Sequence, residues 1–215
     1  MSINYIVYHP ERESTNLGDY KIYHDKFDGN EDPYIWNKEF LHSFCHITQM
    51  SPQVGSKIFW VSGDTYPDFN KLDCDCVFVV KEKIYWSEAN RISIDDKVVD
   101  NEQIFEHHYN WVNPPHYEHQ FLKRKRYTLK ADSDKSFQPQ DKNQALIDII
   151  PFLNGQGITK EHLRNSISRT RDSKRARNSR PFKLPDELAV KLYEFLLLTE
   201  IKIKGQMIEN RHPPG

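Results

Sequence analysis

Three short runs of β-branched and aromatic residues limit most strongly what this chain can fold into. They are INYIVY at 3–8, IFWV at 58–61 and CDCVFVV at 74–80. Such residues are enriched in strands, and short apolar runs bounded by turn residues are typical of buried strands. We therefore expect a mainly β body. In it, the third run should be followed by a charged break at Lys81–Lys83 and a short strand ending at Trp86.

The segments between these runs predict a loop, a helix and two further β elements. The polar stretch 9–20, HPERESTNLGDY, is typical of a loop. In 36–50, WNKEFLHSFCHITQM, apolar residues recur every three or four positions, which indicates a helix ending before Pro52. The stretch 92–100 predicts a hairpin, and KRKRYTLKAD at 123–132 predicts a strand.

The C-terminal third changes to a helical period. Asp141 with Gln144 resembles a capping box before ALIDII, and Thr159 could cap a helix that contains Leu163 and Ile167. A second amphipathic helix is expected from a first helical residue at Pro185 to about Ile201. Its first turn carries Asp186 and Glu187, and its apolar face carries Leu188, Leu192, Phe195 and Leu196.

These patterns predict an α+β fold. We expect a mainly β body at 1–135, formed by a curved sheet or a small barrel with inserted helices. A helical part at 136–215 should carry a basic arm and pack on that body. The 215 residues suffice for one domain, or for one domain with a helical extension.

Charge is distributed unevenly along the chain. The net charge is −1, yet 121–183 holds sixteen Lys/Arg against six Asp/Glu, a local +10, and the remaining residues carry −11. Such polarisation indicates contact with nucleic acid or a membrane surface. We find no apolar run long enough to span a membrane and no signal-peptide pattern, and three cysteines fit a reducing cytoplasm.

Two basic clusters carry the leading hypothesis, contact with nucleic-acid phosphates. In RNSISRTRDSKRARNSRPF, 164–182, the apolar stripe stops at Ile167, so Ser168–Arg180 should be an exposed arm rather than a packed helix. Arginine suits phosphate recognition, although charge runs are often only solvated surface. The predicted phosphate contacts are Lys123, Arg124, Lys125, Arg126, Arg169, Arg171, Lys174, Arg175, Arg177 and Arg180.

Three tryptophans have polar neighbours in the sequence and are candidates for stacking on bases. Trp60, Trp86 and Trp111 occur in WVSGD, YWSE and NWVN. Aromatic rings hold single-stranded or flipped bases by stacking. The alternative for each ring is a place in the core.

Metal and catalytic motifs are weak. His42, Cys45 and His46 lie close in sequence, Cys74 and Cys76 form C-x-C and would share a strand face, and the remaining histidine group is His107, His108, His116 and His119. None has the spacing of a known zinc site, so we expect no metal. Asp73 and Asp75, with Glu82, could hold Mg²⁺ in a nuclease. Phosphate-loop, Rossmann and serine-hydrolase motifs do not occur.

The segment VGSKIFWVSG, followed by a loop and the strand CVFVV, resembles the PUA-like folds, which include the EVE, YTH and ASCH domains. The match rests on Gly55, Ile58–Val61 and Ser62–Gly63, while Ser56–Lys57 replace the acidic residue common in that group. The resemblance implies a curved β barrel that reads a modified base, with Trp60 and Ser62 at the pocket wall.

Three functional classes therefore stay open. The first is a cytoplasmic nucleic-acid-binding protein without a cofactor, and the second is a Mg²⁺-dependent nuclease. The third is a protein–protein module of a defence or counter-defence system, which forms a homodimer or binds a partner through the helix at 185–201. For that helix, a place in the core is the simpler alternative.

Overall fold

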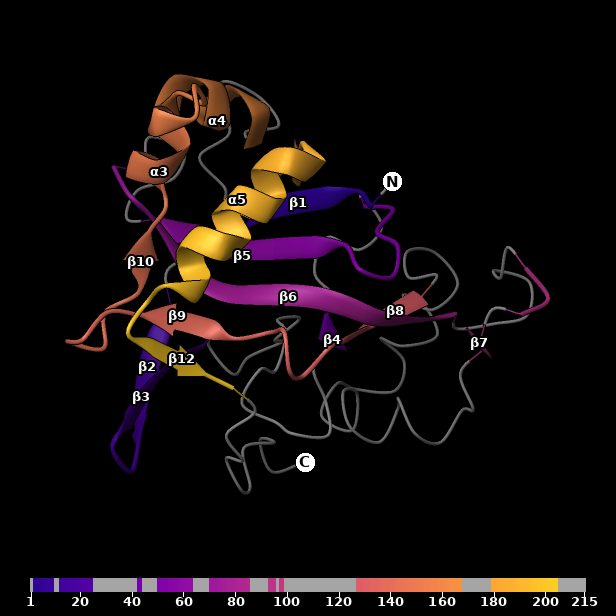
Figure 1. Cartoon of the computed structure of the whole chain (residues 1–215), viewed down its shortest axis with the longest axis horizontal. Helices are drawn as coiled ribbons and strands as arrows, with labels where there is room; N and C mark the ends of the chain where they lie inside the picture. The colour runs from indigo at the N-terminus through magenta and orange to yellow at the C-terminus, as the bar shows by residue number, and fades with distance from the viewer. Residues whose placement is uncertain are drawn as a thin grey trace, which may run out of the picture.

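The computed structural model describes residues 2–9, 12–24, 42–43, 50–63, 70–85, 93–95, 97–98, 127–167 and 179–204. In this part of the chain the fold is α+β, as expected (Figure 1). The first strands are β1 (Asn4–His9), β2 (Glu13–Leu17), β3 (Tyr20–His24), β4 (His42–Ser43), β5 (Lys57–Gly63), β6 (Leu72–Tyr85), β7 (Lys97–Val98) and β8 (Tyr127–Ala131). The later elements are β9 (Gln138–Gln140), β10 (Ile147–Asp148), α3 (Ile150–Gly155), α4 (Lys160–Ile167), β11 (Phe182–Leu184), α5 (Asp186–Leu197) and β12 (Ile201–Ile203).

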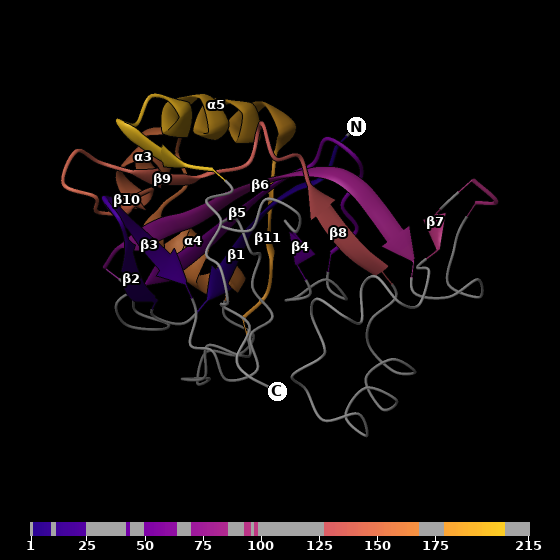
Figure 2. The same cartoon turned by 90° about the horizontal axis from the view of Figure 1, so that it is seen from below.

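One mixed sheet forms the centre of the molecule. Its strand order is β11-β1-β5-β6-β8-β4, and β10 and β7 also pair with β6. β1 and β5 are parallel, whereas β5 and β6 are antiparallel. β6 is long and bends along its length (Figure 2). This order is open, so the described strands form a curved sheet and no closed barrel.

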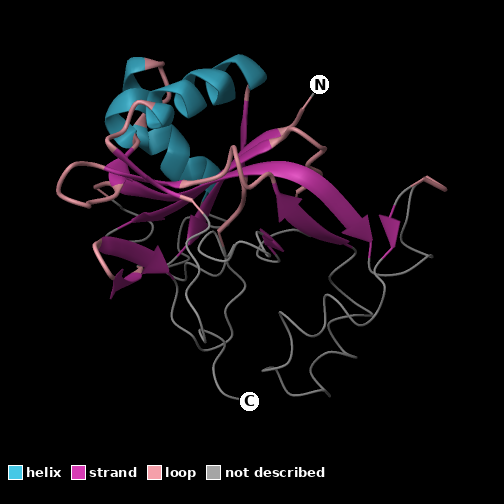
Figure 3. Cartoon of the chain, turned by 60° about the horizontal axis from the view of Figure 1, so that its bottom comes forward, coloured by secondary structure: helices cyan, strands magenta, loops and turns pink. Residues whose placement is uncertain are grey.

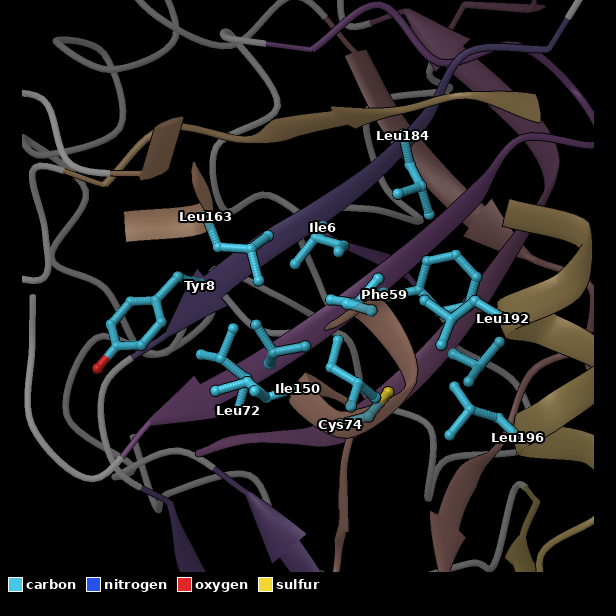
Figure 4. Packing of buried hydrophobic residues seen from close by; sticks show 14 of the residues in the cluster. Ile6, Tyr8, Phe59, Leu72, Cys74, Ile150, Leu163, Leu184, Leu192 and Leu196 are labelled. Atoms are coloured by element: carbon cyan, nitrogen blue, oxygen red, sulfur yellow. The ribbon is translucent and has the colours of Figure 1, made fainter. Parts of the chain in front are cut away.

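All three described helices pack against one face of the sheet (Figure 3). This helix face carries alternate residues of β1 and β5, such as Ile6 and Phe59, which are fully buried. Leu163 of α4 and Leu192 of α5 are also fully buried there (Figure 4). Residues from both sides of position 135 share this core.

The opposite face is covered in part by the hairpin of β2 and β3 (Figure 2). The core on this hairpin face contains Tyr5, Val7, Trp60 and Phe78 of the central strands, together with Ile22 of β3. The prediction of a loop at 9–20 is therefore wrong. Gly18, with φ +57°, occupies the first position of the two-residue turn, where glycine is favoured in hairpins.

β6 contains two bulges, and they explain where its structure differs from the pattern expected from the sequence. Between Val80 and Glu82 the register with β8 shifts, so the charged break expected at Lys81–Lys83 is an irregularity within one strand. The second shift lies opposite Trp60 and Val61. An extra residue in a strand reverses the alternation beyond it.

Two expected helix features in the described residues are wrong. His42–Ser43, inside the predicted helix 36–50, pairs with β8 as a strand. The predicted capping box fails because the Asp141 side chain accepts hydrogen bonds from the backbone of Asn143 and Ala145, each at 2.8 Å. Such local bonding favours a turn over a helix.

The C-terminal helices largely follow their sequence patterns. The Thr159 hydroxyl accepts a hydrogen bond from the His162 backbone N–H at 3.1 Å, so the predicted cap of α4 is confirmed. α5 buries Ala189, Leu192 and Leu196, but Pro185 precedes its first residue and the helix ends at Leu197. Ile201 lies in β12 instead, and Phe195 of the predicted apolar face is 36% exposed. None of the helices in the described residues has the length and apolar character to span a membrane.

Candidate nucleic-acid interface

Two hydrogen bonds attach the described end of the arginine-rich stretch to the body. The backbone N–H of Arg180 donates to the carbonyl of Ile167, the last residue of α4, at 2.7 Å. Ser179 donates from its hydroxyl to the carbonyl of Tyr8 in β1 at 3.3 Å. Segment 168–178, which lies outside the described residues, therefore leaves and rejoins the fold beside the end of β1.

This attachment reduces the number of residues that can belong to the predicted exposed arm. Ser179 is only 1% exposed, and Phe182–Leu184 forms β11 against β1. The expectation that Ser168–Arg180 is an exposed arm is thus wrong at Ser179, which is packed into the body, whereas Arg180 is exposed as expected. This contact could not be predicted, because Ser179 lies between Asn178 and Arg180 in a polar stretch typical of a solvated surface.

Three exposed cations lie within three residues of the attachment point along the chain. Arg164 lies on α4 one turn before Ile167, Arg180 follows Ser179, and Lys183 is on β11. One helical turn is about 5.4 Å long and a strand rises about 3.3 Å per residue. The three side chains therefore extend the positive charge of 168–178 onto the described surface. Arg164 and Lys183 were not among the predicted contacts.

The other basic cluster joins the fold at a distant point. It directly precedes Tyr127, which pairs with Tyr85 at the end of β6 and donates from its hydroxyl to the carbonyl of Met50 at 2.7 Å. The arginine-rich segment attaches beside Tyr8 of β1. Tyr8 pairs with Val61 of β5, which pairs in turn with Cys74 of β6. At about 3.3 Å per residue, the stretch from Cys74 to Tyr85 spans up to about 36 Å.

Most of the predicted contact residues belong to segments outside the described part of the chain. Lying outside the described residues are Trp86, Trp111, Lys123, Arg124, Lys125, Arg126, Arg169, Arg171, Lys174, Arg175 and Arg177. The same holds for the side chains of the candidate metal ligands His42, Cys45, His46, His107, His108, His116 and His119.

The two described residues of the expected base pocket are buried. Trp60 is 0% exposed within the core of the hairpin face, and Ser62 is 5% exposed. A ring enclosed by core side chains offers no face to a base. The expectation that Trp60 is an accessible stacking ring is therefore wrong. Its ring lies in the core, which was the alternative.

The three acids of the nuclease hypothesis have separate partners. Asp75 forms a buried ion pair with Arg12, Asp73 pairs with Lys71 at 2.5 Å, and Glu82 pairs with Lys97. Glu82 is up to about 30 Å along β6 from Asp73, because strands rise about 3.3 Å per residue. The described residues contain no group of three side chains that could hold a metal ion.

Cys74 and Cys76 lie on opposite faces of the sheet, contrary to expectation. Cys74 belongs to the core of the helix face and Cys76 to that of the hairpin face. The reason is the bulge, since Trp60 pairs with Cys76 and Val61 with Cys74, which leaves Asp75 as the extra residue. Burial, and then the charge of Asp75, raises the pKa of both thiols well above its ordinary value.

A polar cluster that the sequence did not reveal attaches the hairpin to the body. We call it the clasp, and its members are Arg12, Asp75, Gln138, Gln140 and Gln144. The three glutamines bond the backbone of β3 at Lys21 and Tyr23, as a neighbouring strand would. The sequence QPQDKNQ carries the three glutamines, but such a pattern does not by itself predict a contact with a neighbouring strand.

No family model matches the chain, and neither the curated proteins nor the solved structures that were compared give a significant match.

Proposed function

We propose that this protein binds nucleic acid through phosphate contacts made by segment 168–178 and the cations around its attachment point. The observation that carries the proposal is the hydrogen bond between Arg180 and Ile167, which fixes both ends of an arginine-rich segment beside exposed Arg164 and Lys183. A segment closed at its base keeps its charges near one place on the body, and it loses less chain entropy on binding than a free tail.

The chemistry of the segment supports phosphate over simple solvation. Arginine presents several donors in a planar fork that matches phosphate oxygens, and 169–180 holds five arginines and one lysine. The rest of the chain is acidic, so the attraction is local rather than a property of net charge. The second cluster, at 123–126, joins the fold far along β6 and would contact another part of a long ligand.

The proposal also includes a PUA-like relationship for the β body. The antiparallel pairing of β5 with β6 supports it, because the resemblance implies consecutive barrel strands at these positions. The open strand order and the burial of Trp60 do not support a closed barrel with Trp60 as the reader. Recognition of a modified base is therefore left out of the proposed function.

The test is binding of fluorescent DNA and RNA oligonucleotides at increasing salt. Replacing Arg169, Arg171, Arg175 and Arg177 by Gln should weaken binding strongly. It should also make the slope of log K against log salt shallower by about one per lost phosphate contact. A variant with Arg180→Gln and Lys183→Gln should show the same effect with a smaller change in slope.

The matched control removes two cations elsewhere. Lys135 and Lys191 are 63% and 48% exposed and form only surface pairs with Asp132 and Glu187. Their replacement by Gln changes the net charge equally, and it should leave affinity and slope nearly unchanged. If the wild-type chain binds no DNA or RNA at ~50 mM salt, or if the control lowers affinity as much as Arg180/Lys183, the proposal is wrong.

A further inference from the structure

The hairpin of β2 and β3 has two outer edges, and the clasp occupies the edge that belongs to β3. Leu17 pairs with Tyr20 across the two-residue turn, so the hydrogen bonds between the strands are made at this pair and at every second pair beyond it. The backbone groups of Lys21 and Tyr23 therefore point away from β2. The clasp confirms this direction, because its glutamine amides bond the N–H and the carbonyl of both residues.

The same alternation directs the backbone of Ser14 and Asn16 to the outer edge of β2. Asn16 pairs with Lys21 and Ser14 with Tyr23, so the N–H and carbonyl groups of Ser14 and Asn16 point away from β3. No described strand pairs with β2 on this side, and both residues are exposed. Figure 2 shows β2 on the side of β3 that faces away from β9. The edge therefore presents two donors and two acceptors.

The other edge strands in the described residues carry features that hinder pairing with a further strand. β11 has three residues, lies between Pro181 and Pro185, and carries Lys183. β12 also has three residues, with Lys202 at its centre, and β4 and β7 have two residues each. Short strands, prolines and lysines are the usual protection of a sheet edge. β2 has five residues without proline, lysine or register shift, so its edge is unprotected.

We propose that β2 pairs with β2 of a second copy of this chain, in an antiparallel arrangement whose two-fold axis passes beside Thr15. In this register each Ser14 lies opposite Asn16 of the other copy. Both residues direct their backbone groups to the outer edge, so each of the two Ser14–Asn16 pairs forms two hydrogen bonds. The four bonds use every donor and acceptor that the two edges present. The product is a four-stranded sheet in the order β3-β2-β2-β3, and its two-fold symmetry closes the assembly at two copies.

The side chains of β2 favour a second copy over an unrelated strand. A foreign strand is selected by pockets that accept its alternate side chains, whereas this edge carries the small polar and exposed Ser14 and Asn16. Pairing by backbone alone requires donors and acceptors at matching positions, and a copy of β2 supplies them by symmetry. Each Glu13 then lies opposite Leu17, which keeps the two carboxylates about 13 Å apart along the strands, so like charges do not face each other.

The test is sedimentation velocity of the full chain at increasing concentration. One strand pair buries much less than the ~1,000 Å² of a stable interface, so we expect a reversible dimer with a dissociation constant of about 0.1–1 mM. The mean mass should rise from 25.6 kDa toward twice that value. Pairing through β2 does not depend on nucleic-acid binding, and the measurement is made without nucleic acid.

Proline variants of β2 remove the donors of this interface. Ser14→Pro eliminates two of the four bonds and should weaken association about tenfold or more. Ser14→Pro with Asn16→Pro eliminates all four, and the chain should stay monomeric. Both N–H groups point away from β3, where a strand accommodates proline. The matched control is Ser14→Ala with Asn16→Ala, which keeps every backbone donor and should leave the dissociation constant within about twofold of the wild-type value.

Hydrogen exchange locates the interface without any substitution. The amides of Ser14 and Asn16 should exchange rapidly in dilute samples and gain protection as the concentration rises. The Ile22 amide, which bonds Thr15 across the hairpin, should stay protected throughout, and it reports whether the proline variants keep the hairpin. If they lose it, the concentration dependence of exchange in the wild-type chain decides.

Four results would overturn this assignment. The first is a chain that stays monomeric up to ~1 mM, and the second is a dimer that persists in the double proline variant while Ile22 stays protected. The third is protection of Ser14 and Asn16 that is already complete in dilute samples, which would mean that another segment of the same chain covers the edge. The fourth is an unrelated peptide that co-purifies with the wild-type chain and is lost from the double proline variant.

Discussion

The two faces of the central sheet are covered by different kinds of contact. On the helix face, α3, α4 and α5 bring apolar side chains such as Leu163 and Leu192 onto β1, β5 and β6. On the hairpin face, β2 and β3 contribute the partly buried Leu17 and the buried Ile22, and the clasp adds glutamine amides and one buried ion pair. Among the described residues, the hairpin is thus attached by a polar network as well as by apolar contact, whereas the helices are attached mainly by apolar contact.

The two faces should therefore respond differently to substitution. Apolar burial is roughly additive, so the helix face loses free energy in proportion to the area and cavity at each site. In a buried polar network, one substitution can lose more free energy than its own contacts supply, because it leaves the partners without hydrogen bonds.

The largest effect is expected from breaking the ion pair of the clasp. Arg12→Met leaves the Asp75 carboxylate buried without its counter-charge and should lower the free energy of unfolding by about 3–5 kcal/mol. Urea denaturation followed by tryptophan fluorescence measures this. The double variant Arg12→Met, Asp75→Leu should recover most of the loss, because an apolar pair of similar volume replaces both charges. A double variant as unstable as the single one would contradict the account.

The corresponding test on the helix face is Leu192→Ala. Leu192 is 0% exposed in the core, so the lost burial and the cavity should lower the free energy of unfolding by about 2–5 kcal/mol. Val190→Ala on the same helix is the control. Val190 is 38% exposed, and its replacement should change stability by less than about 0.5 kcal/mol. Equal effects at the two positions would contradict the packing of α5.

A smaller effect is expected where one amide of the clasp is removed. Gln138→Leu leaves the Tyr23 N–H and carbonyl without their side-chain partners and should destabilise the protein by about 1–3 kcal/mol. Hydrogen exchange is the sharper measurement, because the Tyr23 amide should lose protection while the β5 amides keep theirs. Uniform loss of protection would mean that the hairpin does not open separately.

The cap of α4 should contribute less. Thr159→Ala removes the hydrogen bond to the His162 N–H and should lower stability by about 1 kcal/mol. Thr159→Ser keeps the hydroxyl and is expected to stay near wild type. Thermal denaturation of the three proteins tests this order, and equal melting temperatures would mean that the cap makes no net contribution.

The smallest effect is a dependence on pH at the start of α5. Hydrogen bonds from the side chains of Asn4 and then Ser2 lower the pKa of Asp186. A carboxyl whose folded pKa is lowered stabilises the fold above its unfolded pKa, and that contribution is lost as the pH falls toward the folded pKa. Asp186→Asn should therefore flatten the stability profile below about pH 4 and leave its shape near pH 7 unchanged.

The sequence predicted the helix face far better than the hairpin face. Runs such as INYIVY and the spacing of Leu163, Ile167 and Leu192 report burial directly, because apolar periodicity is a local signal. The clasp is formed by residues 12, 75 and 138–144, which are distant in sequence and polar. Nothing local distinguishes Gln138 from a surface glutamine, so its partners are known only once the strands are placed.

The candidate interface was predictable only in part, for a related reason. The count of arginines and the end of the apolar stripe at Ile167 could be read locally, and Ile167 is buried as the stripe predicts. The closure by Ser179 and Arg180 could not, because it depends on β1 lying beside the end of α4. Likewise, the pattern around Trp60 does not reveal that the hairpin of β2 and β3 closes over the same core.

The bulge at Asp75 reverses the alternation of side chains between the two faces of the sheet along β6. Before the bulge, an even-numbered residue such as Cys74 lies on the helix face. After the bulge, an even-numbered residue such as Cys76 lies on the hairpin face. Deleting Asp75 would remove the extra residue, so Cys74 could stay paired with Val61 and Cys76 with Trp60 in a strand that alternates without a bulge. Both cores could keep their residues, and the deletion should remove mainly the ion pair with Arg12 that attaches the hairpin.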